Sequence, residues 1–174
     1  AIAVIRLSGS NSLDITKNLT KKKKISDRTA NFVSFFDPKG SIIDRGLIIY
    51  FKAPSSYTGE DMLEIHTHGS IAIINKMLEI LEETPGCRFA LPGEFSKRSF
   101  VNGKNDLSHF EGLANLILSE TEQQRIVASK QTFGQTQNIC KLWREIIVEN
   151  LAILDSAIDF PEAVSYTHLR AHET

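Results

Sequence analysis

Hydrophobic positions in the first part of the chain follow strand-like spacing in three stretches. The apolar run at residues 1–7 predicts a buried strand. Residues 31–36 and 41–51 flank Asp37-Pro38-Lys39-Gly40, a sequence typical of a tight turn, and therefore predict a hairpin. Residues 62–68 predict a further strand, since apolar and polar side chains alternate along it.

Helical patterns separate these strands. A short helix is expected after Ser10 or Asn11, and a longer one after Ser70. The longer helix has one predicted apolar face, formed by Ile71, Ile74, Leu78 and Leu81. A short strand at 87–90 and a helical turn that ends at Gly103 complete this part of the pattern.

The pattern becomes entirely helical after Lys104. An apolar stripe begins at Phe110, and a second one runs from Ile139 to Ile158. We therefore predict an α+β domain at 1–104 and an all-α part at 105–162. Residues 163–174 show neither periodicity nor caps and are predicted to be a non-native tail.

The composition limits the class of protein but does not indicate what the protein binds. The 174 residues, 41% of them hydrophobic, allow one medium domain and a smaller helical one. A formal net charge of -1 gives no global field that attracts nucleic acid. No apolar run approaches the roughly 18 residues of a membrane span. The isolated Cys87 and Cys140 are expected to be reduced and buried.

Two segments, residues 57–69 and 91–107, combine turn-forming glycines with charged side chains and are predicted to form two walls of one site. Strand alternation places Glu64, His66 and His68 on one face. They could be metal ligands, but neighbours on one face of a strand lie about 6 to 7 Å apart, which disfavours convergence on one ion.

Three charged residues remain as candidates for binding. Glu64 on a rigid strand could accept two parallel hydrogen bonds from the edge of a pterin or guanine, or it could be an ordinary salt-bridged glutamate. Arg6 lies in an apolar strand and needs either an internal carboxylate or an anionic ligand as its partner. Lys104 could bind an anionic ligand or be an ordinary surface lysine.

Two common catalytic motifs are absent from the sequence. Gly103-Lys104 lacks the earlier glycine and the following Ser or Thr of a phosphate-binding loop. No GxSxG elbow of a serine hydrolase is present.

Four segments carry a family resemblance that extends over residues 1–162. They are VIRLSG at 4–9, SYTGEDMLEIHTHG at 56–69, LPGEFSKRSFVNGKNDL at 91–107 and AIDFPE at 157–162. Together they resemble the N-terminal region of the tRNA modification GTPases MnmE, also called TrmE. The resemblance implies an aminomethyltransferase-like folate-binding domain followed by a truncated all-α helical domain.

The resemblance also implies a function, cofactors and partners. Members of the family bind 5-formyl-tetrahydrofolate or a related tetrahydrofolate and dimerise through their N-terminal domains. With a flavin-dependent MnmG or GidA partner they modify the wobble uridine of tRNA, using GTP, Mg²⁺ and K⁺ in the full-length protein. The resemblance implies a location in the bacterial cytoplasm, with an organellar homologue as the alternative. It implies no association with a membrane.

The family's folate contacts fall on Arg6, Glu64 and Lys104, and the resemblance implies neither a catalytic residue nor a metal ligand in this chain. Three features depart from the family: Ala1 and Ala3 in place of a glycine-rich lead-in, the pair His66-Thr67, and the tail at 163–174. We expect a fragment without the GTPase domain, inactive by itself. A stand-alone folate enzyme and a non-catalytic interaction module are the alternatives.

Overall fold

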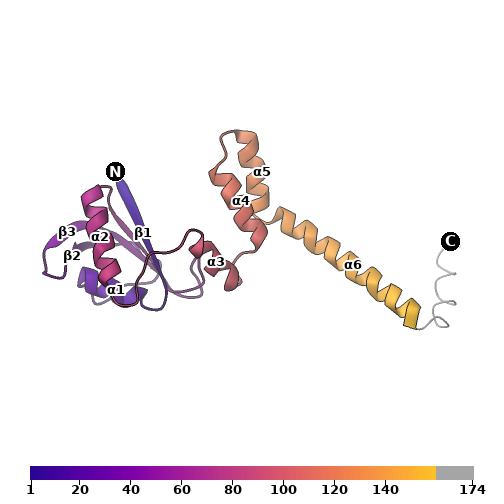
Figure 1. Cartoon of the computed structure of the whole chain (residues 1–174), viewed down its shortest axis with the longest axis horizontal. Helices are drawn as coiled ribbons and strands as arrows, with labels where there is room; N and C mark the ends of the chain where they lie inside the picture. Colours follow the sequence, from indigo (N-terminus) through magenta and orange to yellow (C-terminus); the bar gives the residue numbers. More distant parts are fainter. Residues whose placement is uncertain (160–174) are drawn as a thin grey trace. The chain divides into compact units, whose positions relative to one another are not determined.

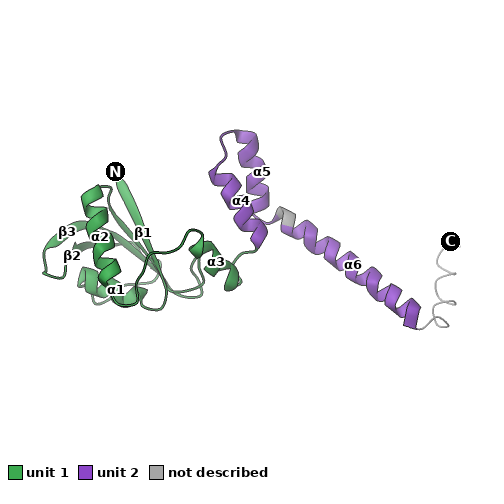
Figure 2. Ribbon diagram, viewed as in Figure 1, with its two compact units in different colours: residues 1–106 green, residues 107–174 purple. Residues whose placement is uncertain are grey.

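The computed structural model describes residues 1–159, apart from the side chains of residues 135 and 136. The predicted end of the helical part at 162 and the predicted tail at 163–174 lie outside these residues. Two compact units divide the chain, one formed by residues 1–106 and the other beginning at Leu107 (Figure 2). The predicted boundary after Lys104 lies two residues before this division.

The first unit is built on a four-stranded antiparallel sheet (Figure 1). Its strands are β1 (Ile2–Ser8), β2 (Asn31–Phe36), β3 (Ile42–Phe51) and β4 (Met62–His68), arranged in the order β1-β4-β3-β2. The helices of this unit are α1 (Ser12–Thr20), α2 (Ile71–Glu83) and α3 (Glu94–Val101). The predicted α+β class and the hairpin of β2 and β3 are confirmed.

The core lies between the sheet and the helices α1 and α2, which cover one of its faces (Figure 1). Alternation in β4 sends Leu63 and Ile65 into this core, where both are fully buried. The buried apolar residues of the cluster are Ile15, Leu19, Val33, Phe35, Ile48, Tyr50, Leu63, Ile65, Met77 and Leu81.

Three expectations about this unit are wrong. Ile2 and Val4 of β1 lie on the face of the sheet that α1 and α2 do not cover, so they remain 75% and 49% exposed instead of buried. Residues 87–90 form neither strand nor helix. The predicted apolar face of α2 is only partly the core-facing one: Leu81 is buried as predicted, but Met77 is buried too and Ile71 is 77% exposed.

The second unit is helical as far as the structure describes it. It contains α4 (Leu107–Ile117), α5 (Glu122–Thr132) and α6 (Gln135–Asp159). A capping box begins α5, in which the Thr121 hydroxyl accepts from the Gln124 N–H while the Gln124 side chain accepts from the Thr121 N–H. Cys140 lies exposed on α6, so its predicted burial is wrong; both cysteines are free.

Within residues 1–159, no helix combines the length and apolar character needed to cross a membrane.

Met77 provides a test of the packing between α2 and the sheet. Its side chain is fully buried, so Met77→Ala is expected to lower the free energy of unfolding by about 2 to 5 kcal/mol in urea denaturation. Ile71→Ala on the same helix is the control and should stay within about 0.5 kcal/mol of the unchanged protein. Equal losses for the two variants would contradict this arrangement.

Candidate functional site: a polar pocket at the end of the sheet

Antiparallel pairing of β1 with β4 brings two of the predicted site residues together. Arg6 and Glu64 are register partners, and Arg6 Nε donates to Glu64 Oε1 at 2.9 Å. The Glu64 side chain is only 15% exposed, whereas that of Arg6 is 53% exposed. Arg6 therefore has the internal carboxylate partner that was one of its two alternatives.

The second carboxylate oxygen of Glu64 faces a polar atom that lacks a partner. His66 Nε2 lies 3.5 Å from Glu64 Oε2, beyond ordinary hydrogen-bond distance. This nitrogen is buried and has no hydrogen-bond partner. A ligand group that both donates and accepts hydrogen bonds could satisfy the two side chains.

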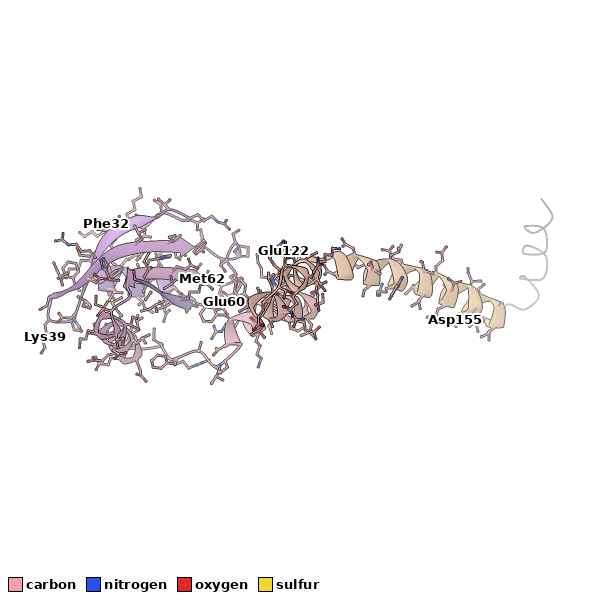
Figure 3. The ribbon with its side chains drawn as sticks, turned by 90° about the horizontal axis from the view of Figure 1, so that it is seen from above. Phe32, Lys39, Glu60, Met62, Glu122 and Asp155 are labelled. Carbon is pink, nitrogen blue, oxygen red and sulfur yellow. The ribbon has the colours of Figure 1, made fainter. Side chains whose placement is uncertain are left out.

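A pocket of about 430 Å³ opens beside Glu64, at the end of the sheet where β3 ends and β4 begins. Glu64 and Lys104 both line it, and Phe51 and Tyr57 supply aromatic surface. Met62, which is labelled with Glu60 in Figure 3, marks this end of the sheet. The volume falls within the range of small-molecule sites.

Two cationic side chains line the same pocket. Lys104 Nζ donates to the Pro54 carbonyl at 3.0 Å, which holds the ammonium at the rim. Arg28 donates to the Ser55 carbonyl on the same loop. Arg28 was not among the residues predicted from the sequence. Its backbone is left-handed, with a φ of 52°, and this conformation is rare outside glycine, so no residue pattern indicated it.

The two segments predicted to be walls of one site do meet. Arg98 Nη1 donates to Glu60 Oε2 at 2.8 Å, and Asn102 Nδ2 donates to the Thr58 carbonyl at 2.7 Å. Gly59 permits this approach: its φ is 79°, and an added Cβ would lie 2.9 Å from the Cβ of Asn102. Lys104 reaches the pocket because the loop and the α3 segment are fastened in this way.

Glu94 anchors the α3 segment. Its carboxylate accepts from the guanidinium groups of Arg88 and Arg98 and from the Leu91 N–H. These bonds hold the pKa of Glu94 well below its usual range, and the bond from Arg88 has the largest effect. The left-handed Gly103, with φ 65°, ends this segment at the predicted cap.

His68 of β4 is bonded to a carboxylate on β3. His68 Nδ1 lies 2.8 Å from Asp44 Oδ1, and the His68 N–H donates to Asp44 Oδ2. Burial acts to raise the pKa of Asp44, but these bonds leave it lowered. Among residues 1–159, no group of three His, Cys, Asp or Glu side chains is placed to hold a metal ion.

Comparison with known proteins identifies the family. The model of the family described as GTP-binding protein TrmE N-terminus matches residues 1–104. The chain belongs to the TrmE N-terminal family. The predicted family membership is thereby confirmed, and the family is GTP-binding by its description.

Three relatives of this TrmE family chain are named tRNA modification GTPase MnmE. The Parvibaculum lavamentivorans protein is 46% identical over 92% of the chain, and the Aquifex aeolicus protein is 45% identical over 93%. The Wolbachia pipientis protein is 43% identical over 94%. The chain spans only 37%, 36% and 36% of the lengths of these relatives.

The Glu94 network predicts a pH-dependent stability. Because its folded-state pKa is depressed, Glu94 stabilises the fold above the unfolded value of about 4.3, and this contribution disappears as pH falls through the folded-state pKa. Glu94→Gln should therefore lower the melting temperature at pH 7, with a difference from the unchanged protein that shrinks in increasingly acidic buffer.

The matched control is Glu79→Gln, which removes a surface ion pair with Lys76 on α2. It should change the melting temperature little. A Glu94→Gln effect that is independent of pH, or no larger than that of the control, would contradict the anchoring role.

Proposed function

We propose that this chain binds a tetrahydrofolate, such as 5-formyl-tetrahydrofolate, in the pocket shared by Glu64 and Lys104. The observation that carries the proposal is the lining of that pocket, which combines one nearly buried carboxylate, two cations and two aromatic rings. A folate has a matching set of groups: a pterin edge with adjacent donors, flat rings and an anionic tail.

Glu64 is proposed to hold the pterin edge. A carboxylate can accept two parallel N–H bonds from such an edge, and the position of Glu64 on a paired strand fixes its direction. Arg6 already uses Glu64 Oε1, but a carboxylate has further lone pairs available. Arg6 is not among the residues that line this pocket. We propose that Arg6 positions the carboxylate and contacts a carbonyl or anionic group of the ligand where the ligand extends past Glu64.

Lys104 is proposed to bind the anionic part of the ligand, with Arg28 beside it. Lys104 donates to the Pro54 carbonyl, so a ligand carboxylate would be a stronger acceptor for it. Arg28 donates to the Ser55 carbonyl and already lies 4.0 Å from the Asp27 carboxylate, so its contribution is proposed to be the smaller one. Phe51 and Tyr57 provide flat apolar surface for the ring system between the two polar ends.

We further propose that the chain serves a tRNA wobble-uridine modification GTPase as its folate-binding and dimer-forming part. The names of its relatives support the tRNA and GTPase parts of this proposal. The resemblance supports four further proposals. The chain dimerises through residues 1–104, works with a MnmG-type flavoprotein and is located in a bacterial cytoplasm. The full-length protein uses GTP, Mg²⁺ and K⁺. The chain alone is proposed to be catalytically inactive.

Substitution of Glu64 tests the folate site. Glu64→Gln keeps the size of the side chain but removes its charge and one acceptor, so affinity for 5-formyl-tetrahydrofolate should fall about 10- to 100-fold in calorimetric titration. Lys104→Met should also weaken binding, because the ligand loses its cation.

Glu79→Gln, an exposed carboxylate on α2, is the control and should bind the folate normally. Circular dichroism should confirm that each variant is folded. Unchanged affinity in a folded Glu64→Gln variant would show that the pocket is not the folate site.

A further inference from the structure

Four consecutive lysines, residues 21–24, follow directly after α1. Leu19, just before them, is buried, and Ile25, just after them, packs against the same apolar core. These two contacts hold the segment on the first unit, and three of the four lysines between them are exposed. The fold therefore presents the lysines at a fixed place on its surface.

Two of these ammonium groups are positioned by opposite ends of the edge strand β2. Lys22 Nζ donates to Asn31 Oδ1 at 2.8 Å, where β2 begins, and Lys21 Nζ lies 4.1 Å from the centre of the Phe36 ring, where β2 ends. The strand between these ends is roughly 17 Å long. Lys39, labelled in Figure 3, is exposed in the turn after β2 and adds a further ammonium group. We call these residues the lysine row: Lys21, Lys22, Lys23, Lys24 and Lys39.

The positive charge of the lysine row is not cancelled by ion pairs within the described part of the chain. The lysines that do form ion pairs there are Lys17 with Asp14 on α1 and Lys76 with Glu79 on α2. Asp37, in the neighbouring turn, accepts from a backbone N–H and forms no ion pair among the described residues. Like charges gathered in this way repel one another, so an anionic partner would be attracted to the row.

We propose that the lysine row binds the phosphate backbone of tRNA. Lysines that contact successive phosphates release the counterions of the nucleic acid, which supplies affinity that does not depend on sequence. A row of cations along one strand can follow several phosphates of one RNA strand. The net charge of the chain is -1, so the attraction is local to the row. The inference rests on the tRNA part of the proposed function and not on the folate pocket.

The fold of α1 favours RNA over a lipid surface as this partner. A helix that binds a membrane surface inserts an apolar face between the lipids and uses its basic residues beside that face. The apolar residues of α1 are not available for this role, because Ile15 and Leu19 are buried in the core and Leu13 packs against it. Charge is what the segment offers to a partner, and a phosphate backbone is recognised through charge.

The double substitution Lys23→Gln/Lys24→Gln in the full 174-residue chain tests the proposal. Both side chains are exposed and form no hydrogen bond or ion pair within the described residues, so the variant should fold normally, as circular dichroism can confirm. The measurement is fluorescence anisotropy of a labelled tRNA transcript with uridine at the wobble position. The unchanged chain should bind with a dissociation constant of about 1 to 100 µM. The variant should bind about tenfold more weakly, and its plot of log affinity against log salt should be less steep by roughly 1 to 2.

The matched control is Lys130→Gln/Lys141→Gln, which removes the same charge from two exposed lysines of α5 and α6. It should change the affinity for tRNA by less than about twofold, because these lysines lie outside the lysine row. Titration with 5-formyl-tetrahydrofolate separates this proposal from the folate proposal. Lys23→Gln/Lys24→Gln should bind the folate normally, and Glu64→Gln should bind the tRNA normally.

Three results would overturn the proposal. The first is no binding of the tRNA by the unchanged chain in a buffer of about 50 mM salt, where phosphate contacts are strong. The second is an equal loss of affinity in the two double variants. The third is tighter binding to phosphatidylserine vesicles or to polyglutamate than to the tRNA, which would assign the lysine row to a lipid surface or to an acidic protein. Failure of the unchanged chain to bind the folate, with tRNA binding as expected, would contradict the folate proposal alone.

Discussion

The antiparallel pairing of β1 with β4 is the constraint on which the rest of the first unit depends. It places Arg6 opposite Glu64 and Leu7 opposite Leu63, so one register determines both the polar face and the core. A slip of one residue would exchange the two faces and direct Glu64 into the apolar cluster. The burial of Leu63 and Ile65 therefore fixes the direction of the Glu64 carboxylate.

A second set of contacts brings Lys104 to the pocket that Glu64 also lines. Glu94 holds two arginines, and one of them, Arg98, extends to Glu60 on the loop that precedes β4. Asn102 completes the connection by donating to the Thr58 carbonyl. The pocket is thus built by a rigid sheet on one side and by a charged, hydrogen-bonded loop on the other, an arrangement that favours a preorganised site.

Sequence patterns predicted the local features of this arrangement well. Alternation in residues 62–68 correctly placed Glu64, His66 and His68 on one face, and the turn before Ser41 gave the hairpin. The patterns did not reveal which strands become neighbours, so the edge position of β1 was not foreseen, nor that Glu64 is the internal carboxylate that pairs with Arg6.

The remaining differences have similar causes. Residues 87–90 have suitable side chains for a strand but no partner in register, and propensity alone cannot supply one. The exposure of Ile71 depends on how the first turn of α2 meets the sheet, which is a tertiary property. Arg28 reaches the pocket through a left-handed backbone conformation, for which an arginine gives no local signal.

The central claim is that the Glu64 carboxylate and the Lys104 ammonium form the two polar ends of one folate pocket. A crystal structure of the chain with bound 5-formyl-tetrahydrofolate tests this most directly. The account predicts the pterin edge at about 2.7 to 3.2 Å from the Glu64 carboxylate, with the anionic tail at Lys104. A folate bound elsewhere on the chain, with Glu64 bonded only to Arg6, would contradict it.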